Sequence, residues 1–80
     1  MLTVQITKSK RVSAATLADA SRIVAEFTRG KSSTRWYERG GPDIGNVFDE
    51  HGVNIARVSY KGRVWEPGPW HHLGREIKVG

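Results

Sequence analysis

The first hydrophobic pattern along the chain is a strict alternation. Leu2, Val4 and Ile6 alternate with polar residues, and a period of two is typical of a strand that buries one face. We therefore expect a first strand over residues 2–7.

A helical period follows this strand. Apolar residues recur at spacings of three and four, which places them in one stripe of a helix. Ser13 offers an N-cap and Gly30 is placed to end the helix, so the pattern predicts a helix over residues 14–28. On its polar face, Arg22 can pair with an acid on either side. The apolar stripe consists of Leu17, Ala20, Ile23, Val24 and Phe27, and the polar face of Thr16, Asp19, Arg22 and Glu26.

Residues 31–45, KSSTRWYERGGPDIG, show neither the two-residue period of a strand nor the three- and four-residue spacing of a helix. Their content of Ser, Gly and charge predicts a loop. Trp36 and Tyr37 lie inside it, and such a loop either folds its large aromatic residues onto the core or holds them out for a ligand. Of the two interpretations we favour the first.

Three apolar runs between residues 46 and 65 predict a three-stranded antiparallel meander. Its strands are expected at residues 46–49, 53–60 and 63–65, joined by a turn at 49–52 and a tight link at 61–62.

The alternation fails once in the middle strand, and a bulge near Ile55 would restore it. With that bulge, Ala56, Val58 and Tyr60 face the core, while Arg57 faces out. A last short strand is expected at residues 76–79.

These elements predict a single domain over residues 1–80. Its class is α+β, with one helix packed on one face of a small antiparallel sheet. A chain of 80 residues suits one small core. The side chains expected there include Leu17, Val24, Phe27, Val58 and Val64.

Composition narrows the class of protein. Thirteen Lys and Arg against eight Asp and Glu give a net charge of +5, which favours an acidic partner. The chain has no cysteine, which excludes disulfides and thiolate metal sites and fits a cytosolic protein. A signal peptide has cations followed by a continuous apolar run, and the first residues of this chain do not follow that order. No stretch approaches the roughly 20 apolar residues of a membrane span. We therefore expect a cytoplasmic protein with no membrane partner.

Catalytic and metal-binding patterns are weak. The adjacent His71 and His72 do not readily aim at one ion, and His51 lies in a turn. No nucleophile-elbow pattern surrounds a serine, and GGPDIG at residues 40–45 lacks the spacing of a phosphate-binding loop. We expect no enzymatic activity, no metal and no cofactor.

Binding is the remaining class of function. Arg, Trp and Tyr often dominate interface energy, and the same mixture suits single-stranded nucleic acid. Against this, the aromatic residues could belong to the core while the cations only keep the protein soluble; for Trp36 and Trp65 both interpretations stay open. The candidate binding residues are Arg35, Trp36 and Arg39 in the predicted loop, and Arg57, Lys61, Arg63 and Trp65 on the hairpins.

One surface is expected to combine these cations. Arg57 should face away from the core, Lys61 should lie at a turn, and Arg63 should follow just beyond it. All three are therefore expected on one exposed side, joined by Arg35 or Arg39.

Residues 47–65, VFDEHGVNIARVSYKGRVW, resemble a segment of small uncharacterised proteins of bacterial phages, plasmids and integrated elements. The resemblance covers about a quarter of the chain and implies a mobile-element setting inside a bacterial host cell. Small proteins in that setting often inhibit host defence, as anti-CRISPR proteins do. The best known of them are acidic nucleic-acid mimics, whereas this chain is basic and would need an acidic patch on its partner.

Two functions therefore stay open. In the first, the protein is a monomeric, non-enzymatic inhibitor or adaptor that binds a host protein or nucleoprotein complex with an acidic surface. In the second, it is an accessory protein that binds DNA or RNA directly with the same cations. We favour the first because no known nucleic-acid-binding motif is present.

Overall fold

The computed structural model describes residues 1–68 and 74–79, and these form two helices and a six-stranded antiparallel sheet. This confirms the predicted α+β class. The strands are β1 (Leu2–Gln5), β2 (Arg11–Ala14), β3 (Asn46–Phe48), β4 (Asn54–Val58), β5 (Val64–Trp65) and β6 (Glu76–Ile77); the helices are α1 (Leu17–Thr28) and α2 (Ser33–Gly40), followed by a 3-10 turn, η1 (Gly41–Asp43).

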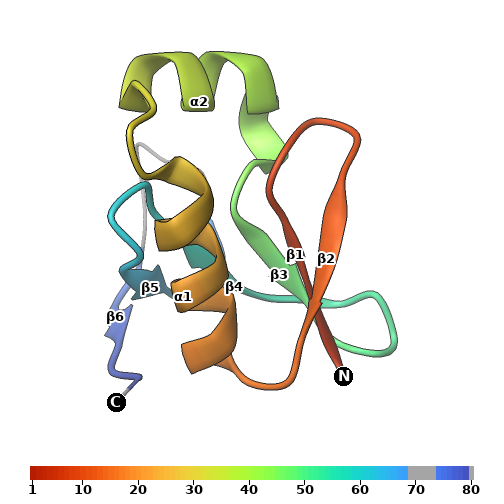
Figure 1. The fold of residues 1–80 in the computed structure, drawn as a ribbon. Helices are drawn as coiled ribbons and strands as arrows, with labels where there is room; N and C mark the ends of the chain where they lie inside the picture. Colours follow the sequence, from red (N-terminus) through yellow and green to blue (C-terminus); the bar gives the residue numbers. More distant parts are fainter. Residues whose placement is uncertain (69–73, 80) are drawn as a thin grey trace.

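The sheet has the strand order β2-β1-β3-β4-β5-β6, and each strand is antiparallel to its neighbours. Both helices come from the connection between β2 and β3. α1 lies against one face of the sheet, and α2 crosses beyond the C-terminal end of α1 (Figure 1). The chain thus places α2 next to the turn between β1 and β2.

The N-terminal strand is shorter than predicted because the chain turns back on itself. β1 ends at Gln5, and the Ile6 N–H donates to the Lys10 carbonyl at 3.1 Å to close the turn into β2. Val4 of β1 then pairs with Val12 of β2. The sequence does not reveal β2, because Val12 is its only large apolar side chain and one such residue shows no period.

The start of α1 also differs from the prediction. The helix begins at Leu17 rather than Ala14, and its N-cap is Thr16 rather than Ser13. Thr16 Oγ1 accepts a hydrogen bond from the Asp19 N–H at 3.1 Å, whereas Ser13 lies in β2. Ser and Thr are both good caps, so the pairing of β2 with β1 decides which of them serves.

The polar face and the end of α1 are confirmed. Arg22 pairs with Asp19 at 3.4 Å and with Glu26 at 3.7 Å. Gly30 follows the helix with a φ of 76°, the left-handed conformation that favours glycine at a helix C-terminus.

The predicted loop over residues 31–45 is wrong in its central part, where the chain forms α2. Ser32 Oγ caps this helix by accepting from the Arg35 N–H at 3.4 Å, and the Gly41 N–H donates to the Tyr37 carbonyl at its other end. α2 has only eight residues. Of its described large side chains it buries Trp36 alone, so it carries no apolar stripe for periodicity to detect.

The strands β3, β4 and β5 pair in chain order. Val47 pairs with Ala56 and Phe48 with Asn54, so the register skips Ile55. This confirms the expected bulge.

Both predicted turns beside β4 are present. The Gly52 N–H donates to the Asp49 carbonyl at 3.0 Å, and the Gly62 N–H donates to the Ser59 carbonyl at 2.8 Å. The last strand, β6, falls within the expected residues 76–79.

The core lies between α1 and the sheet. Val24, Val58 and Val64 are buried as predicted, while Leu17 and Phe27 are half-buried and pack against the core. The buried apolar residues are Val4, Ile6, Ala14, Ala20, Val24, Trp36, Ile44, Val47, Ala56, Val58 and Val64.

Candidate binding site

The expected basic surface on the hairpins does not form, because Arg57 is buried. Its side chain faces away from Ala56 and Val58 as predicted, yet it is only 3% exposed. Arg57 Nε donates to the Ile44 carbonyl at 3.2 Å, and Nη1 donates to the Gly68 carbonyl at 2.9 Å. Arg57 thus contacts the end of the described segment after β5, at Gly68, and it is a structural residue.

Burial also changes the acid–base properties of Arg57. Desolvation lowers the pKa of its guanidinium, and the negative charge of Asp43 opposes that shift.

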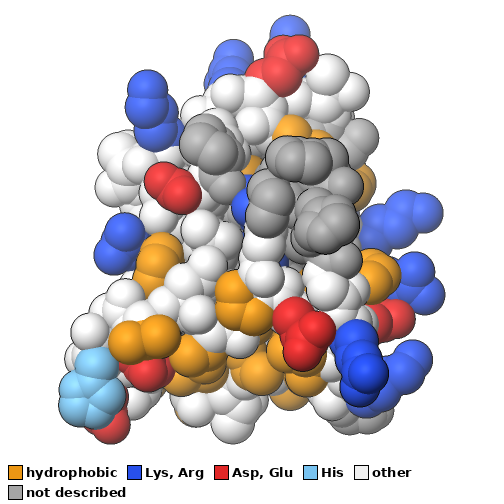
Figure 2. Space-filling model, turned by 180° about the vertical axis from the view of Figure 1, so that it is seen from behind, with side chains coloured by type: hydrophobic (Ala, Val, Ile, Leu, Met, Phe, Trp, Pro, Cys, Tyr) orange, Lys and Arg blue, Asp and Glu red, His pale blue; other side chains and the backbone are white. Residues whose placement is uncertain are grey.

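The other cations expected on this surface, Lys61 and Arg63, lie between β4 and β5. Lys61 and Arg63 are exposed, but Arg63 Nε lies 3.4 Å from a carboxylate oxygen of Glu76. Trp65 is half-buried, and its indole Nε1 is shielded from solvent. Seen from behind (Figure 2), Lys and Arg side chains lie mainly around the rim of this face, and hydrophobic side chains form a band across its lower half.

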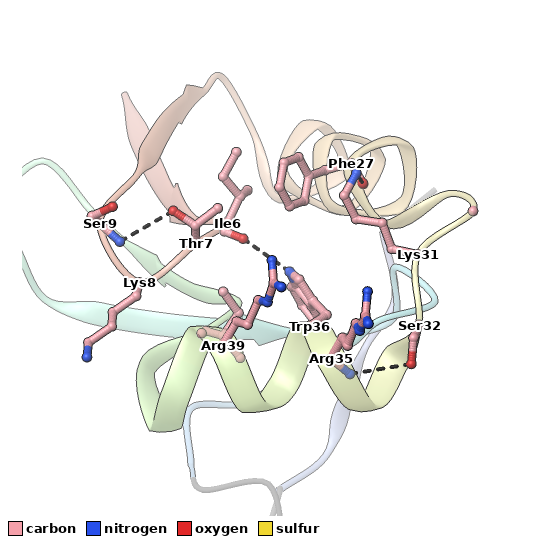
Figure 3. A pocket seen from close by; sticks show the side chains of 13 residues that line it. Ile6, Thr7, Lys8, Ser9, Phe27, Lys31, Ser32, Arg35, Trp36 and Arg39 are labelled. Atoms are coloured by element: carbon pink, nitrogen blue, oxygen red, sulfur yellow. Dashed lines mark hydrogen bonds between the residues drawn. The ribbon is translucent and has the colours of Figure 1, made fainter.

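A hollow on the other side of the molecule gathers the cations of the predicted loop. We call it the cationic groove. It has a volume of about 680 Å³ and lies between the β1–β2 turn, the end of α1 and α2 (Figure 3). Its lining residues are Ile6, Thr7, Lys8, Ser9, Phe27, Gly30, Lys31, Ser32, Arg35, Trp36, Arg39, Gly40 and Ile44.

Four cations line the cationic groove. Arg35 and Arg39 rise from α2 one helical turn apart, Lys31 follows α1, and Lys8 lies in the β1–β2 turn (Figure 3). No Asp or Glu is among the described lining residues. Within residues 1–68 and 74–79, none of the four cations lies within 4 Å of a carboxylate oxygen.

Trp36 forms part of the apolar floor of the groove. It is 5% exposed, and its Nε1 donates to the Ile6 carbonyl at 3.1 Å. Its ring lies 5.0 Å from that of Tyr37 and 6.2 Å from that of Tyr60, between ring centroids. The favoured interpretation of this aromatic pair, that it folds onto the core, is confirmed.

Hydrogen bonds fix α2 and the end of α1 around the groove. The Tyr37 hydroxyl accepts from the Tyr60 N–H at 2.9 Å, and the Tyr60 hydroxyl donates to the Lys31 carbonyl. Lys31 Nζ donates to the Phe27 carbonyl at 2.8 Å and lies 4.5 Å from the centre of the Phe27 ring. The walls of the groove are thus tied to the β4–β5 turn.

Two of the hydroxyl groups that line the groove accept hydrogen bonds from the backbone. Thr7 Oγ1 accepts from the Ser9 N–H at 3.3 Å, and Ser32 Oγ accepts the capping bond from Arg35. The charged groups that line the groove are those of Arg and Lys, which bind anions with charge-assisted hydrogen bonds.

Sequence reasoning found Arg35, Trp36 and Arg39 but missed Lys8, Lys31 and the apolar floor. These residues were missed because the sequence pattern did not predict the helix α2. Two signals pointed to it, namely a capping Ser32 three residues before Arg35, and Gly40-Gly41-Pro42 as a stop. With α2 recognised, the four-residue spacing of the two arginines places them on one helix face.

No cluster of three or more His, Asp or Glu suitable for a metal ion occurs among the described residues. His71 and His72 lie outside them. His51 is exposed beside Glu50, with Nε2 3.9 Å from a carboxylate oxygen.

Comparison with protein-family models, curated proteins and solved structures gives no match. Neither helix in the described part of the chain is long and apolar enough to span a membrane.

Proposed function

We propose that this protein is a small non-enzymatic binding protein that docks an acidic surface of a partner protein at the cationic groove. The observation that carries the proposal is that Lys8, Lys31, Arg35 and Arg39 all line one hollow that has no lining carboxylate among the described residues.

This arrangement has an energetic cost in the free protein. Like charges four positions apart on a helix destabilise it by about 0.2–0.5 kcal/mol, and Arg35 and Arg39 are such a pair. Arg22 of α1, by contrast, is flanked by two acids. An anionic partner would supply the counter-charge that the groove lacks, so the arrangement favours binding over solubility alone.

The resemblance of residues 47–65 to mobile-element proteins supports a host target. We propose an inhibitor or adaptor, acting in the bacterial cytoplasm, whose partner is a host protein or nucleoprotein complex with an acidic patch. None of residues 47–65 lines the groove, so this segment acts as scaffold and the groove as the contact.

The competing function is direct binding of DNA or RNA, since the same four cations would also suit phosphates. It predicts a steep loss of affinity with rising salt, in proportion to the number of phosphates neutralised.

The test measures fluorescence anisotropy of labelled polyglutamate and of labelled oligothymidine. Each probe is titrated with the natural protein, with Arg35→Gln/Arg39→Gln, and with Lys61→Gln/Arg63→Gln as a control that removes the same charge from exposed positions outside the groove. We expect polyglutamate affinity to fall at least about tenfold in the groove variant and far less in the control.

Equal losses in both variants would show that binding follows net charge, and the proposed site would be wrong. Tighter binding of oligothymidine than polyglutamate, with a steep salt dependence between about 50 and 200 mM, would favour the nucleic-acid function instead.

A further inference from the structure

Resting on the proposed function, we infer that the cationic groove takes one amphipathic helix of the partner, which presents two carboxylates a helical turn apart beside apolar side chains. We infer this occupant from two features of the groove, its paired cations along one wall and the apolar residues of its floor.

The spacing of the cations sets the spacing of the carboxylates. Arg35 and Arg39 are four residues apart on α2, which is about 6 Å along a helix axis. Both side chains project from α2 toward Ile6 and Phe27 (Figure 3). A partner helix lying along α2 with acids four residues apart matches this interval, and each guanidinium can then bind one carboxylate through two hydrogen bonds.

The floor of the groove selects for apolar groups next to those acids. Of the four apolar residues that line it, Phe27 is half-buried, while Ile6, Trp36 and Ile44 are buried, so Phe27 provides most of the open apolar surface of these four. Gly40 lets α2 pack closely on this floor, because a Cβ at that position would clash with the Ile44 side chain. An aliphatic side chain on the partner would displace water from this surface, a favourable contribution that a purely polar anion could not make.

The aromatic residues of the groove disfavour nucleobases as occupants. A base gains affinity by stacking on an open aromatic face. Trp36 is 5% exposed, and the Lys31 ammonium lies over the Phe27 ring at 4.5 Å. Trp36 therefore offers little surface for stacking, and Lys31 already covers one face of Phe27.

Two labelled alanine-based helical peptides of identical composition test this inference. In the first, two glutamates four positions apart lie beside a stripe of leucines; in the second, the same residues lie on opposite faces of the helix. We expect the first to bind the natural protein at least about tenfold more tightly, and to lose that advantage in Arg35→Gln/Arg39→Gln but keep it in Lys61→Gln/Arg63→Gln.

A charge exchange separates this inference from a general loss of folding. Arg35→Glu/Arg39→Glu should bind the first peptide poorly and regain affinity for the same peptide with lysines in place of its glutamates. Circular dichroism of both variants provides the folding control.

Equal binding of the two peptides would overturn the inferred spacing, and displacement of the first peptide by oligothymidine at lower concentration than by polyglutamate would overturn the inferred occupant. In either case groove-dependent polyglutamate binding would still uphold the proposed function. If no polyanion binds at the groove, the proposed function itself fails.

Discussion

Arg57 illustrates how much a single side chain can contribute when the chain covers it. Its guanidinium donates to the carbonyls of Ile44 and Gly68, so it joins the start of β3 to the segment after β5. A buried donor set of this kind stabilises the fold only while both partners remain in place. Arg57 is therefore not part of an exposed binding surface, contrary to the expectation that it shares one exposed side with Lys61 and Arg63.

We predict that Arg57→Ala lowers the free energy of unfolding by about 2–4 kcal/mol, because the two carbonyls lose their donor and the packed stem is removed. Arg63→Ala, at an exposed position that pairs with Glu76, should cost no more than about 1 kcal/mol. Urea denaturation followed by circular dichroism measures both. Equal stability of the two variants would mean that Arg57 does not hold the segment near Gly68.

A second residue-scale feature is the turn that begins at Asp49. Its Oδ1 accepts from the Val53 N–H at 2.9 Å and from the His51 N–H at 2.8 Å. The hydrogen bond from Val53 is the largest influence on the pKa of Asp49 and holds it below its ordinary value. A lowered pKa means that the unfolded chain binds the proton more readily than the folded one, so ionised Asp49 stabilises the fold.

This contribution should be complete above the unfolded-state pKa and should disappear as the pH falls through the folded-state pKa. We predict that Asp49→Ala melts at a lower temperature than the natural protein at about pH 6, and that this difference shrinks at about pH 3. Asp49→Asn, which keeps an acceptor oxygen but loses the ionisable group, should melt closer to the natural protein than Asp49→Ala does, with the same change between the two pH values. A melting difference for Asp49→Ala that is the same at both pH values would rule out the carboxylate as its source.

At the scale of elements, a side-chain cap fixes the N-terminus of both α1 and α2. Thr16 caps α1 and Ser32 caps α2, and each satisfies an N–H that would otherwise lack a partner within its helix. The Asp19 carboxylate adds a second bond at the start of α1, since its Oδ2 accepts from the Ala15 N–H at 3.3 Å.

The two candidate caps of α1 can be compared directly. We predict that Thr16→Ala lowers the free energy of unfolding by about 1 kcal/mol through loss of the cap, while Ser13→Ala, exposed in β2, changes it by no more than about 0.5 kcal/mol. Thermal or urea unfolding of the two variants provides the measurement. A larger effect for Ser13→Ala would place the helix start where the sequence pattern put it.

At the scale of the whole molecule, the cations behind the net charge of +5 lie in different environments. Lys8 comes from the β1–β2 turn, Lys31 from the end of α1, and the two arginines from α2, so three segments supply one groove. Elsewhere, Arg22 and Arg63 are paired with acids, and Arg57 is buried. Among the described residues, the groove is a place where four cations without a carboxylate oxygen within 4 Å lie beside apolar residues.

The sequence by itself determined the features that depend on near neighbours in the chain. The apolar stripe of α1, the bulge at Ile55 and the turn ending in Gly52 could be predicted because each rests on spacing within a few residues. The α+β class followed from them, since a striped helix and one-faced strands have few ways to bury their apolar sides.

The tertiary structure decided what depends on contacts between distant segments. Ser13 and Thr16 are equivalent caps until β2 pairs with β1. α2 shows no stripe because Trp36 is the only one of its described large side chains that is buried, and the contact of Trp36 with the Ile6 carbonyl is long-range. The alternation along β4 predicted correctly that the Arg57 side chain faces away from Ala56 and Val58. It could not predict that Arg57 is buried there and bonded to the distant Gly68 carbonyl. The groove needs three segments to meet, and the energy that brings them together comes from long-range burial, which no local pattern encodes.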